Sequence, residues 1–253
     1  MSKKETSDDN SKQLNAHLDY LKLSFTKGNY SQFAADAAKE GISYIDFLSQ
    51  LIAGEARLRE DNSAARRVRM ARFPVTKTLD QFNWNWPRKI NRLQIQNLFG
   101  LQFIRDKANA IFLGGVGLGK THLSIAIGHQ AAISGHSVLF STAIDTVNSL
   151  SAAKNAGSLK QELKRYLRPD LLIVDELGYL PIDKQGADLL FQVLSQRYER
   201  GSIIITSNRA YKHWSEIFNN DATLTSALLD RLLHFADTVK IEGKSFRHPE
   251  DTE

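Results

Sequence analysis

The residues best placed to do chemistry form a glycine-rich octapeptide, Gly114-Gly115-Val116-Gly117-Leu118-Gly119-Lys120-Thr121. It fits the phosphate-binding pattern G-x-x-x-x-G-K-[ST] at every fixed position. Glycines allow a tight turn whose N–H groups face phosphate oxygens, and a following helix N-terminus adds partial positive charge. We expect Lys120 to reach the β- and γ-phosphates of a nucleotide and the Thr121 hydroxyl to help hold Mg²⁺. The structural alternative is a plain turn between a strand and a helix.

A pair of carboxylates supplies the second candidate group. Asp175 and Glu176 directly follow the apolar residues 171–174, and Asp175 lies 54 residues after Thr121. We expect Asp175 to hold Mg²⁺ through its water shell. Glu176, on the opposite side of the strand end, is the natural base for polarising an attacking water. An exposed acidic turn is the alternative interpretation.

The adjacent glutamate also separates classes of phosphate-binding protein. The chain lacks the N-K-x-D motif with which small GTPases recognise guanine. Nucleotide kinases transfer phosphate to a small acceptor and need no water-activating glutamate at this position. The sequence therefore favours ATP hydrolysis coupled to motion.

Two further residues have side chains suited to the γ-phosphate. Asn208 follows the β-rich residues 203–206, where its amide could sense the phosphate or orient the water. Arg231 lies in a helical pattern, about 130° from the centre of its leucine face at about 100° per residue. It could serve as an arginine finger offered to a neighbouring subunit. A turn residue and an ordinary surface arginine are the respective alternatives.

The elements that must position these residues alternate between strand and helix. Short apolar or β-branched runs predict strands at residues 110–113, 138–140, 171–174, 203–206 and 238–241. The spacing of apolar residues predicts a helix over 183–200, with Gly201 as its C′ residue. This alternation indicates a parallel sheet with crossover helices, an α/β fold.

Helical patterns also occupy the first part of the chain. Leu14, Leu18, Leu21 and Leu23 open an amphipathic stretch that Gly28-Asn29 should interrupt. A second helix over 30–39 should end at Gly41, and a third should begin at Ser43 as N-cap and end before Pro74. Residues 1–11 are charged, contain no aromatic residue and are expected to be a disordered tail.

Positive charge is concentrated near the end of this helical region. Between residues 57 and 92 there are ten cations and three anions, a local excess of seven against +5 for the whole chain. A phosphate-backbone contact surface and a solvated helix face both fit. The candidate nucleic-acid contacts are Arg57, Arg59, Arg66, Arg67, Arg69 and Arg72.

Aromatic residues mark the connector at residues 73–100, where Phe82, Trp84 and Trp86 precede the glycine loop. They could stack on adenine or pack between domains. Helical spacing resumes at residues 90–103.

Composition limits the remaining function classes. The 253 residues contain no cysteine, which excludes a disulfide framework and a thiolate metal site. The polar start contains no apolar segment of the signal-peptide type, and no run approaches the length of a membrane span. We expect a cytoplasmic protein.

Together these residues resemble the AAA+ ATPases and, within them, the DnaC/IstB group, with the IstB-type transposition helper ATPases most similar. The resemblance covers residues 14–247. Its motifs are the glycine loop and the segments ARFP at 71–74, LIVDELGY at 172–179, QGADLLFQV at 185–193, ITSNR at 205–209, ALLDRL at 227–232 and GKSFR at 243–247. The helix over 183–200 and the segment 243–247 are the more specific parts.

The resemblance implies a Walker A motif at 114–121, Walker B at Asp175-Glu176, sensor 1 at Asn208 and a trans-acting finger at Arg231. Arg247 is a candidate second sensor, but the chain ends too soon after it for a full helical lid. The implied domains are a tail at 1–11, a helical DNA- or partner-binding domain at 12–73, a connector at 74–107 and an AAA+ core at 108–253.

The implied activity is ATP-driven, Mg²⁺-dependent assembly as an oligomer on double-stranded DNA, with a cognate transposase as partner in target selection. Two alternatives stay open. One is a replicative-helicase loader of the same ATPase group, and the other is a regulatory module that binds nucleotide with little turnover.

Overall fold

The computed structural model describes residues 3–246 and divides into two compact units, one up to Ala65 and the other from Arg66. This division falls within a continuous helix and before the domain boundary expected at residue 73. Arg247, the candidate second sensor, lies outside the described residues. Among those described, no helix combines the length and apolar character needed to cross a membrane.

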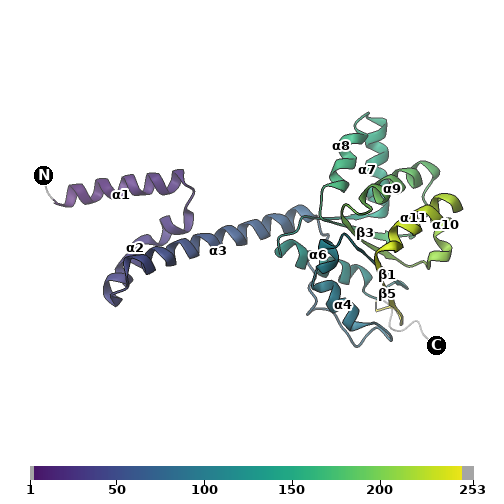
Figure 1. The fold of residues 1–253 in the computed structure, drawn as a ribbon, viewed down its shortest axis with the longest axis horizontal. Helices are drawn as coiled ribbons and strands as arrows, with labels where there is room; N and C mark the ends of the chain where they lie inside the picture. Colours follow the sequence, from purple (N-terminus) through teal and green to yellow (C-terminus); the bar gives the residue numbers. More distant parts are fainter. Residues whose placement is uncertain (1–2, 247–253) are drawn as a thin grey trace. The chain divides into compact units, whose positions relative to one another are not determined.

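The first unit is helical (Figure 1). Its helices are α1 Lys3–Tyr20, α2 Ser24–Glu40 and the first part of α3 Tyr44–Ala71. Ser43 accepts a hydrogen bond from the Asp46 N–H at 3.1 Å, which confirms it as the cap of α3. Gly41 ends α2 with φ 67°, also as predicted.

Two expectations for the first unit were wrong. Gly28 and Asn29 lie within α2, and the break falls earlier, at Lys22, which adopts φ 55°. From Lys3 onward, helix α1 replaces the expected disordered tail. A helix satisfies its backbone hydrogen bonds within the segment itself, so a polar segment can be helical without an apolar face.

The second unit is an α/β domain. Its elements in order are α4 Arg92–Phe99, α5 Gln102–Arg105, β1 Asn109–Gly114, α6 Lys120–Ile133, β2 Val138–Thr142, α7 Ala143–Asn155, α8 Leu159–Leu167, β3 Leu171–Leu177, α9 Lys184–Arg197, β4 Ser202–Ser207, η1 Tyr211–His213, α10 Trp214–Ile217, α11 Ala222–His234 and β5 Ala236–Ile241. All five predicted strands are present.

The sheet is parallel, with strand order β2-β3-β4-β1-β5. Strand β4 therefore lies between β1, which leads into the glycine loop, and β3, which carries the acid pair. Because the strands are parallel, their carboxyl ends share one edge, and the end of β4 lies between the two halves of the site. This order confirms the predicted parallel α/β fold.

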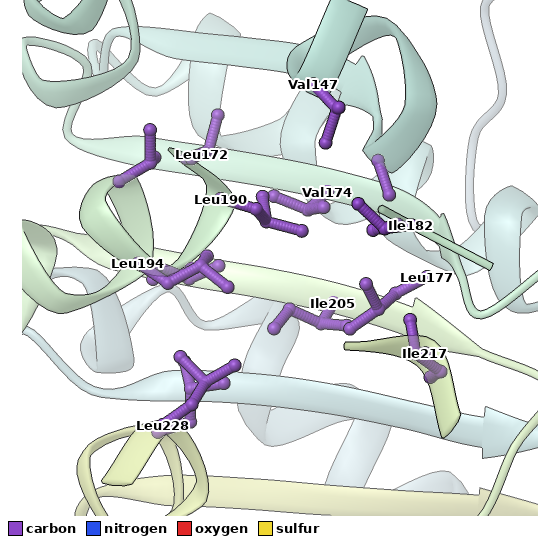
Figure 2. Packing of buried hydrophobic residues seen from close by; sticks show 14 of the residues in the cluster. Val147, Leu172, Val174, Leu177, Ile182, Leu190, Leu194, Ile205, Ile217 and Leu228 are labelled. Carbon is purple, nitrogen blue, oxygen red and sulfur yellow. The ribbon is translucent and has the colours of Figure 1, made fainter. Parts of the chain in front are cut away.

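Each face of the sheet has its own core. Helices α7, α8, α9 and α11 contribute to the core that contains Val174 and Ile205. Helices α4, α5 and α6 contribute to the core on the other face, which contains Ile173 and Ile204. Successive strand residues enter opposite cores, as the two-residue period requires. Figure 2 shows Leu190 and Leu194 of α9 over strands β3 and β4 in the first core.

Two helix boundaries differ from the sequence predictions. Helix α9 ends at Arg197, and Glu199 adopts the left-handed conformation (φ 59°) that was expected of Gly201. Gly201 instead packs against Arg197, because a Cβ there would lie 2.6 Å from the guanidinium Nη2. The predicted helical stretch at 90–103 is split into α4 and α5 at Leu101, which has φ 63°.

Candidate functional site

The glycine loop joins β1 to α6, as its flanking residues predicted. Gly117 and Gly119 have φ 74° and 86°, which side-chain-bearing residues rarely adopt. A Cβ on Gly117 would lie 2.2 Å from Ser245 Oγ, and one on Gly119 would lie 2.5 Å from the Phe82 ring. Both glycines are therefore required by conformation and by space.

Lys120 and Thr121 open helix α6. Lys120 Nζ donates to the carbonyl oxygens of Gly114 at 2.8 Å and Gly115 at 2.6 Å, so the ammonium lies against the loop. The residue at the N-cap of α6 is Gly119, which has no side chain to accept from the first-turn N–H groups. Those N–H groups and the lysine together create the positive environment that phosphate binding needs.

Asp175 connects the loop to the sheet. Its side chain is buried, and Thr121 Oγ1 lies 3.0 Å from both carboxylate oxygens. Thr206 Oγ1 donates to Oδ1 at 2.5 Å. Burial raises the pKa of Asp175, and hydrogen bonds from Thr206 and Thr121 oppose that rise. The two residues that the sequence analysis expects to help hold Mg²⁺ are thus in direct contact.

These two residues have the chemistry of a magnesium site. A threonine hydroxyl beside one carboxylate, next to a phosphate-binding loop, fits an ion that takes its other ligands from phosphate oxygens and water. Within residues 3–246, no cluster of three or more His, Cys, Asp or Glu could enclose a metal by itself. The donor set therefore fits a nucleotide-bound Mg²⁺ better than an all-protein metal site.

Glu176 departs from regular strand geometry. The β3–β4 pairing shifts register between Val174 and Leu177, and Glu176 adopts φ 59°. Its side chain is exposed and lines the same cavity as Lys120. This bulge interrupts the regular alternation of side chains between the two faces of the sheet. Glu176 lines the cavity, and the preceding residue, Asp175, is buried.

The cavity has a volume of about 480 Å³ and is lined by most of the residues predicted to act at the nucleotide. The predicted residues that do not line it are Gly114, Gly115, Asp175 and Arg231. Its lining includes residues 116–121 of the glycine loop, which follow β1. It also includes Glu176 near the end of β3 and Asn208 directly after β4. It also includes Thr206 and Tyr179, which the sequence did not single out. The residues from the connector and the chain end that line it are Val75, Lys77, Gln81, Phe82, Asn83, Trp86, Pro87 and Phe246.

The aromatic residues of the connector separate into two roles. Trp86 lines the cavity, donates from Nε1 to the Lys244 carbonyl at 2.9 Å and meets Phe246 edge-on at 5.0 Å. Trp84 does not line the cavity and packs against Phe82, with Arg92 over its ring. The aromatic residues of the cavity lining are thus Phe82, Trp86, Tyr179 and Phe246, and Trp84 is not one of them.

Arg231 lies on a different part of the same unit. Its Nη1 donates to the Ala227 carbonyl one turn earlier in α11 at 2.8 Å, and its guanidinium lies 5.8 Å from the centre of the Phe191 ring. It does not line the nucleotide cavity. The side chain is half-buried, which agrees with its expected place away from the leucine core of α11.

The candidate nucleic-acid arginines differ in their surroundings. Arg67 Nε donates to the Ala132 carbonyl at 2.7 Å, a contact that ties α3 to the end of α6. Arg59 lies near the carbonyls of Leu21 and Lys22, at 3.4 and 3.3 Å from Nη2. All of the candidate arginines except Arg67 are exposed, namely Arg57, Arg59, Arg66, Arg69 and Arg72. Arg67 therefore has a packing role that the charge pattern did not reveal.

A family model and several known proteins match most of this chain. A family model described as IstB-like ATP binding protein matches residues 16–253. The insertion sequence IS5376 ATP-binding protein of Geobacillus stearothermophilus is 38% identical over 227 residues, which cover 90% of each chain. Its counterpart from insertion sequence IS21 of Pseudomonas aeruginosa is 38% identical over 235 residues, 93% of this chain and 88% of that protein.

The fold also has a solved counterpart. The crystal structure of the DnaC helicase loader is similar with a TM-score of 0.53, over 65% of this chain and 96% of that one. The two sequences are 20% identical, so this likeness concerns the fold alone.

Proposed function

Because this chain belongs to the family of IstB-like ATP-binding proteins, we propose that it is a Mg²⁺-dependent ATPase that assembles on double-stranded DNA and assists a transposase. The observation that carries the ATPase proposal is the contact between Thr121 Oγ1 and both Asp175 oxygens, 3.0 Å each, with Glu176 lining the same cavity. The phosphate-binding loop after β1 thus lies beside the proposed metal-holding acid, Asp175, and the candidate base, Glu176, both in β3.

Each side chain has a defined task in the proposed reaction. Lys120 and the N–H groups of the loop hold the β- and γ-phosphates, and Thr121 and Asp175 would hold Mg²⁺. Bound Mg²⁺ would neutralise charge on the phosphate oxygens as the γ-phosphate leaves. Glu176 accepts the proton of the attacking water, and Asn208 orients that water or the γ-phosphate.

The proposed arginine finger requires a second subunit. Arg231 does not line the cavity of its own chain, and its guanidinium is held on the surface of α11. A cation at the γ-phosphate stabilises the charge of the transition state. We therefore assign Arg231 to the cavity of a neighbouring copy, which makes turnover dependent on assembly.

The DNA and transposase parts of the proposal rest on two observations. The relatives in Geobacillus and Pseudomonas are described as ATP-binding proteins of insertion sequences. The exposed Arg66, Arg69 and Arg72 lie close together in sequence near the end of α3, where they can contact successive phosphates. The arginines fit a phosphate backbone, and duplex DNA is the form that the resemblance to IstB-type helper ATPases implies.

The test is ATP hydrolysis with and without duplex DNA, with particle mass followed in parallel. We expect duplex to stimulate hydrolysis and to promote a large oligomer in the presence of ATP. Stimulation only by single strands or by a helicase would instead support a loader. Nucleotide binding without turnover under any of these conditions would support a regulatory switch.

A further inference from the structure

Within the described part of the chain, Thr206 is the one hydroxyl that contacts both members of the acid pair. It lies near the end of β4, is 1% exposed, and its Oγ1 donates to Asp175 Oδ1 at 2.5 Å. The same oxygen accepts a hydrogen bond from the backbone N–H of Glu176 at 3.0 Å. A hydroxyl has a single proton to donate, so its donor serves Asp175 while a lone pair serves Glu176.

The contact with Glu176 matters because of the bulge in β3. The regular β3–β4 register is lost between Val174 and Leu177, and Glu176 adopts φ 59°. A left-handed conformation is unfavourable for glutamate and persists only where the surroundings hold it. Thr206 supplies a partner for the Glu176 N–H within this bulge.

Ser207 holds the other side of the same bulge. Its Oγ donates to the Leu177 carbonyl at 2.6 Å, and Leu177 resumes the β3–β4 register opposite Ser207. Thr121 approaches Asp175 from the glycine loop and meets only its carboxylate. Of these three hydroxyls, Thr206 is the one that joins the Asp175 side chain to the Glu176 backbone.

We propose that Thr206 is a positioning residue that couples the metal-holding Asp175 to the water-polarising Glu176. This inference rests on the proposed ATPase function of the same site. Through one shared hydroxyl, the placement of the carboxylate and the conformation that directs Glu176 into the cavity are set together. Without this hydroxyl both acids are present but are not held in a common geometry.

The experiment compares Thr206→Val, which keeps the shape and removes the hydroxyl, with Thr206→Ser, which keeps the hydroxyl. Thr238→Val is the matched control. Thr238 lies in the same sheet but does not line the cavity, and the substitution removes the hydrogen bond between its hydroxyl and that of Tyr211. The full-length variants are assayed for kcat and KM for ATP, and the exchange rate of the Glu176 amide is measured by NMR.

We expect Thr206→Val to lower kcat by roughly 10- to 100-fold with little change in KM, since a small misplacement of catalytic groups has effects of this size. Its Glu176 amide should exchange faster than in the wild type, because the variant offers it no hydroxyl acceptor. Thr206→Ser should resemble the wild type in both measurements, and Thr238→Val should change neither.

The coupling role is wrong if Thr206→Val keeps wild-type kcat or if Thr206→Ser is as impaired as Thr206→Val. It is also wrong if the Glu176 amide exchanges as slowly in Thr206→Val as in the wild type. Failure of the proposed function is a separate result, namely a wild-type protein that binds ATP without hydrolysing it. In that case the amide exchange rates still decide whether Thr206 holds Glu176.

Discussion

Glu176 has an exposed side chain on a backbone that the fold holds in an uncommon conformation. Its φ of 59° and the local shift of register place it at a bulge rather than in a regular strand. A bulge bends the strand locally and changes the direction of a side chain. At this position, the change brings a carboxylate to the cavity that Lys120 and Asn208 also line.

The role of Glu176 as base predicts the effect of a Glu176→Gln substitution. The amide keeps the size of the side chain but cannot accept the proton of water at neutral pH. We expect ATP hydrolysis to fall by roughly 10²- to 10⁴-fold, the usual contribution of a general base, with ATP binding retained. Single-turnover hydrolysis and equilibrium binding of ATP measure the two effects.

Lys120→Ala provides the contrast, because in the proposed mechanism the Lys120 ammonium holds phosphate in the ground state as well as in the transition state. It should lose ATP affinity in addition to turnover. Equal turnover of Glu176→Gln and wild type would remove Glu176 from the mechanism and favour the nucleotide-switch interpretation.

At the scale of elements, helix α9 is tied to the sheet by a buried cation. Arg197 is 1% exposed and donates to the carbonyls of Tyr166 at 2.8 Å, Asp170 at 3.2 Å and Ser202 at 2.8 Å. Burial lowers the pKa of Arg197 to about 10, so the guanidinium remains charged at neutral pH. One side chain thus joins α8, the start of β3 and the start of β4.

Replacement of Arg197 by lysine should therefore destabilise the domain. An ammonium cannot reproduce the planar arrangement of donors that meets three carbonyls on different segments. We expect the free energy of unfolding to fall by roughly 2–4 kcal/mol, because hydrogen bonds to charged groups contribute about 1.5–3 kcal/mol each. Urea denaturation measures this change.

Arg200→Lys is the matched control, since Arg200 is exposed just beyond the end of α9. A loss of stability no larger for Arg197→Lys than for this control would show that the three carbonyls do not need the guanidinium.

At the scale of the whole molecule, the distribution of functional groups points to assembly. The nucleotide cavity contains the groups for binding and for water activation, whereas Arg231 lies outside its lining. Each copy thus carries one cavity and one candidate finger for another cavity. This arrangement predicts that catalytic competence belongs to a pair of subunits.

Mixing two inactive variants tests this prediction. Arg231→Ala subunits retain an intact cavity, and Lys120→Ala subunits retain an intact finger. Because a mixed interface can join the intact cavity to the intact finger, we expect part of the ATPase activity to return on mixing. The hydrolysis rate is measured against mixing ratio, with each variant alone as control. No recovery, despite demonstrated exchange of subunits, would exclude a finger that acts in trans.

The proposed DNA contact predicts a change in salt dependence. Simultaneous Arg66→Gln, Arg69→Gln and Arg72→Gln should weaken duplex binding and reduce the slope of log K against log salt by about 0.9 for each phosphate that an arginine had neutralised. Fluorescence anisotropy with labelled duplex at several salt concentrations measures both. Arg67 is left unchanged because its Nε bonds the Ala132 carbonyl.

The matched control removes three exposed cations elsewhere, by glutamine substitution of Arg105, Lys154 and Lys160. It changes the net charge equally. If both triple variants lose the same affinity, the basic stretch contributes only through overall charge, and a specific phosphate-contact surface at the end of α3 is excluded.

The sequence by itself determined the parts of this protein that depend on local patterns. The glycine loop, the acid pair, Asn208 and all five strands were predictable, because turn chemistry and apolar runs are local properties. The capping of α3 by Ser43 belongs to the same class. The left-handed positions at Lys22, Leu101 and Glu199 were not predictable, because residues without a glycine signal adopt them under tertiary constraint.

Only the tertiary structure decided which distant residues complete the cavity. The sheet order places β4 between β1 and β3, which brings Thr206 to Asp175 and Glu176. Trp86 meets the Lys244 carbonyl across 158 positions of chain. Such contacts are set by the order in which strands pair and by the packing of chain segments on the loop. Neither leaves a periodic or local pattern in the sequence. The glycine loop and the acid pair could therefore be predicted from the sequence, whereas the residues that support them could not.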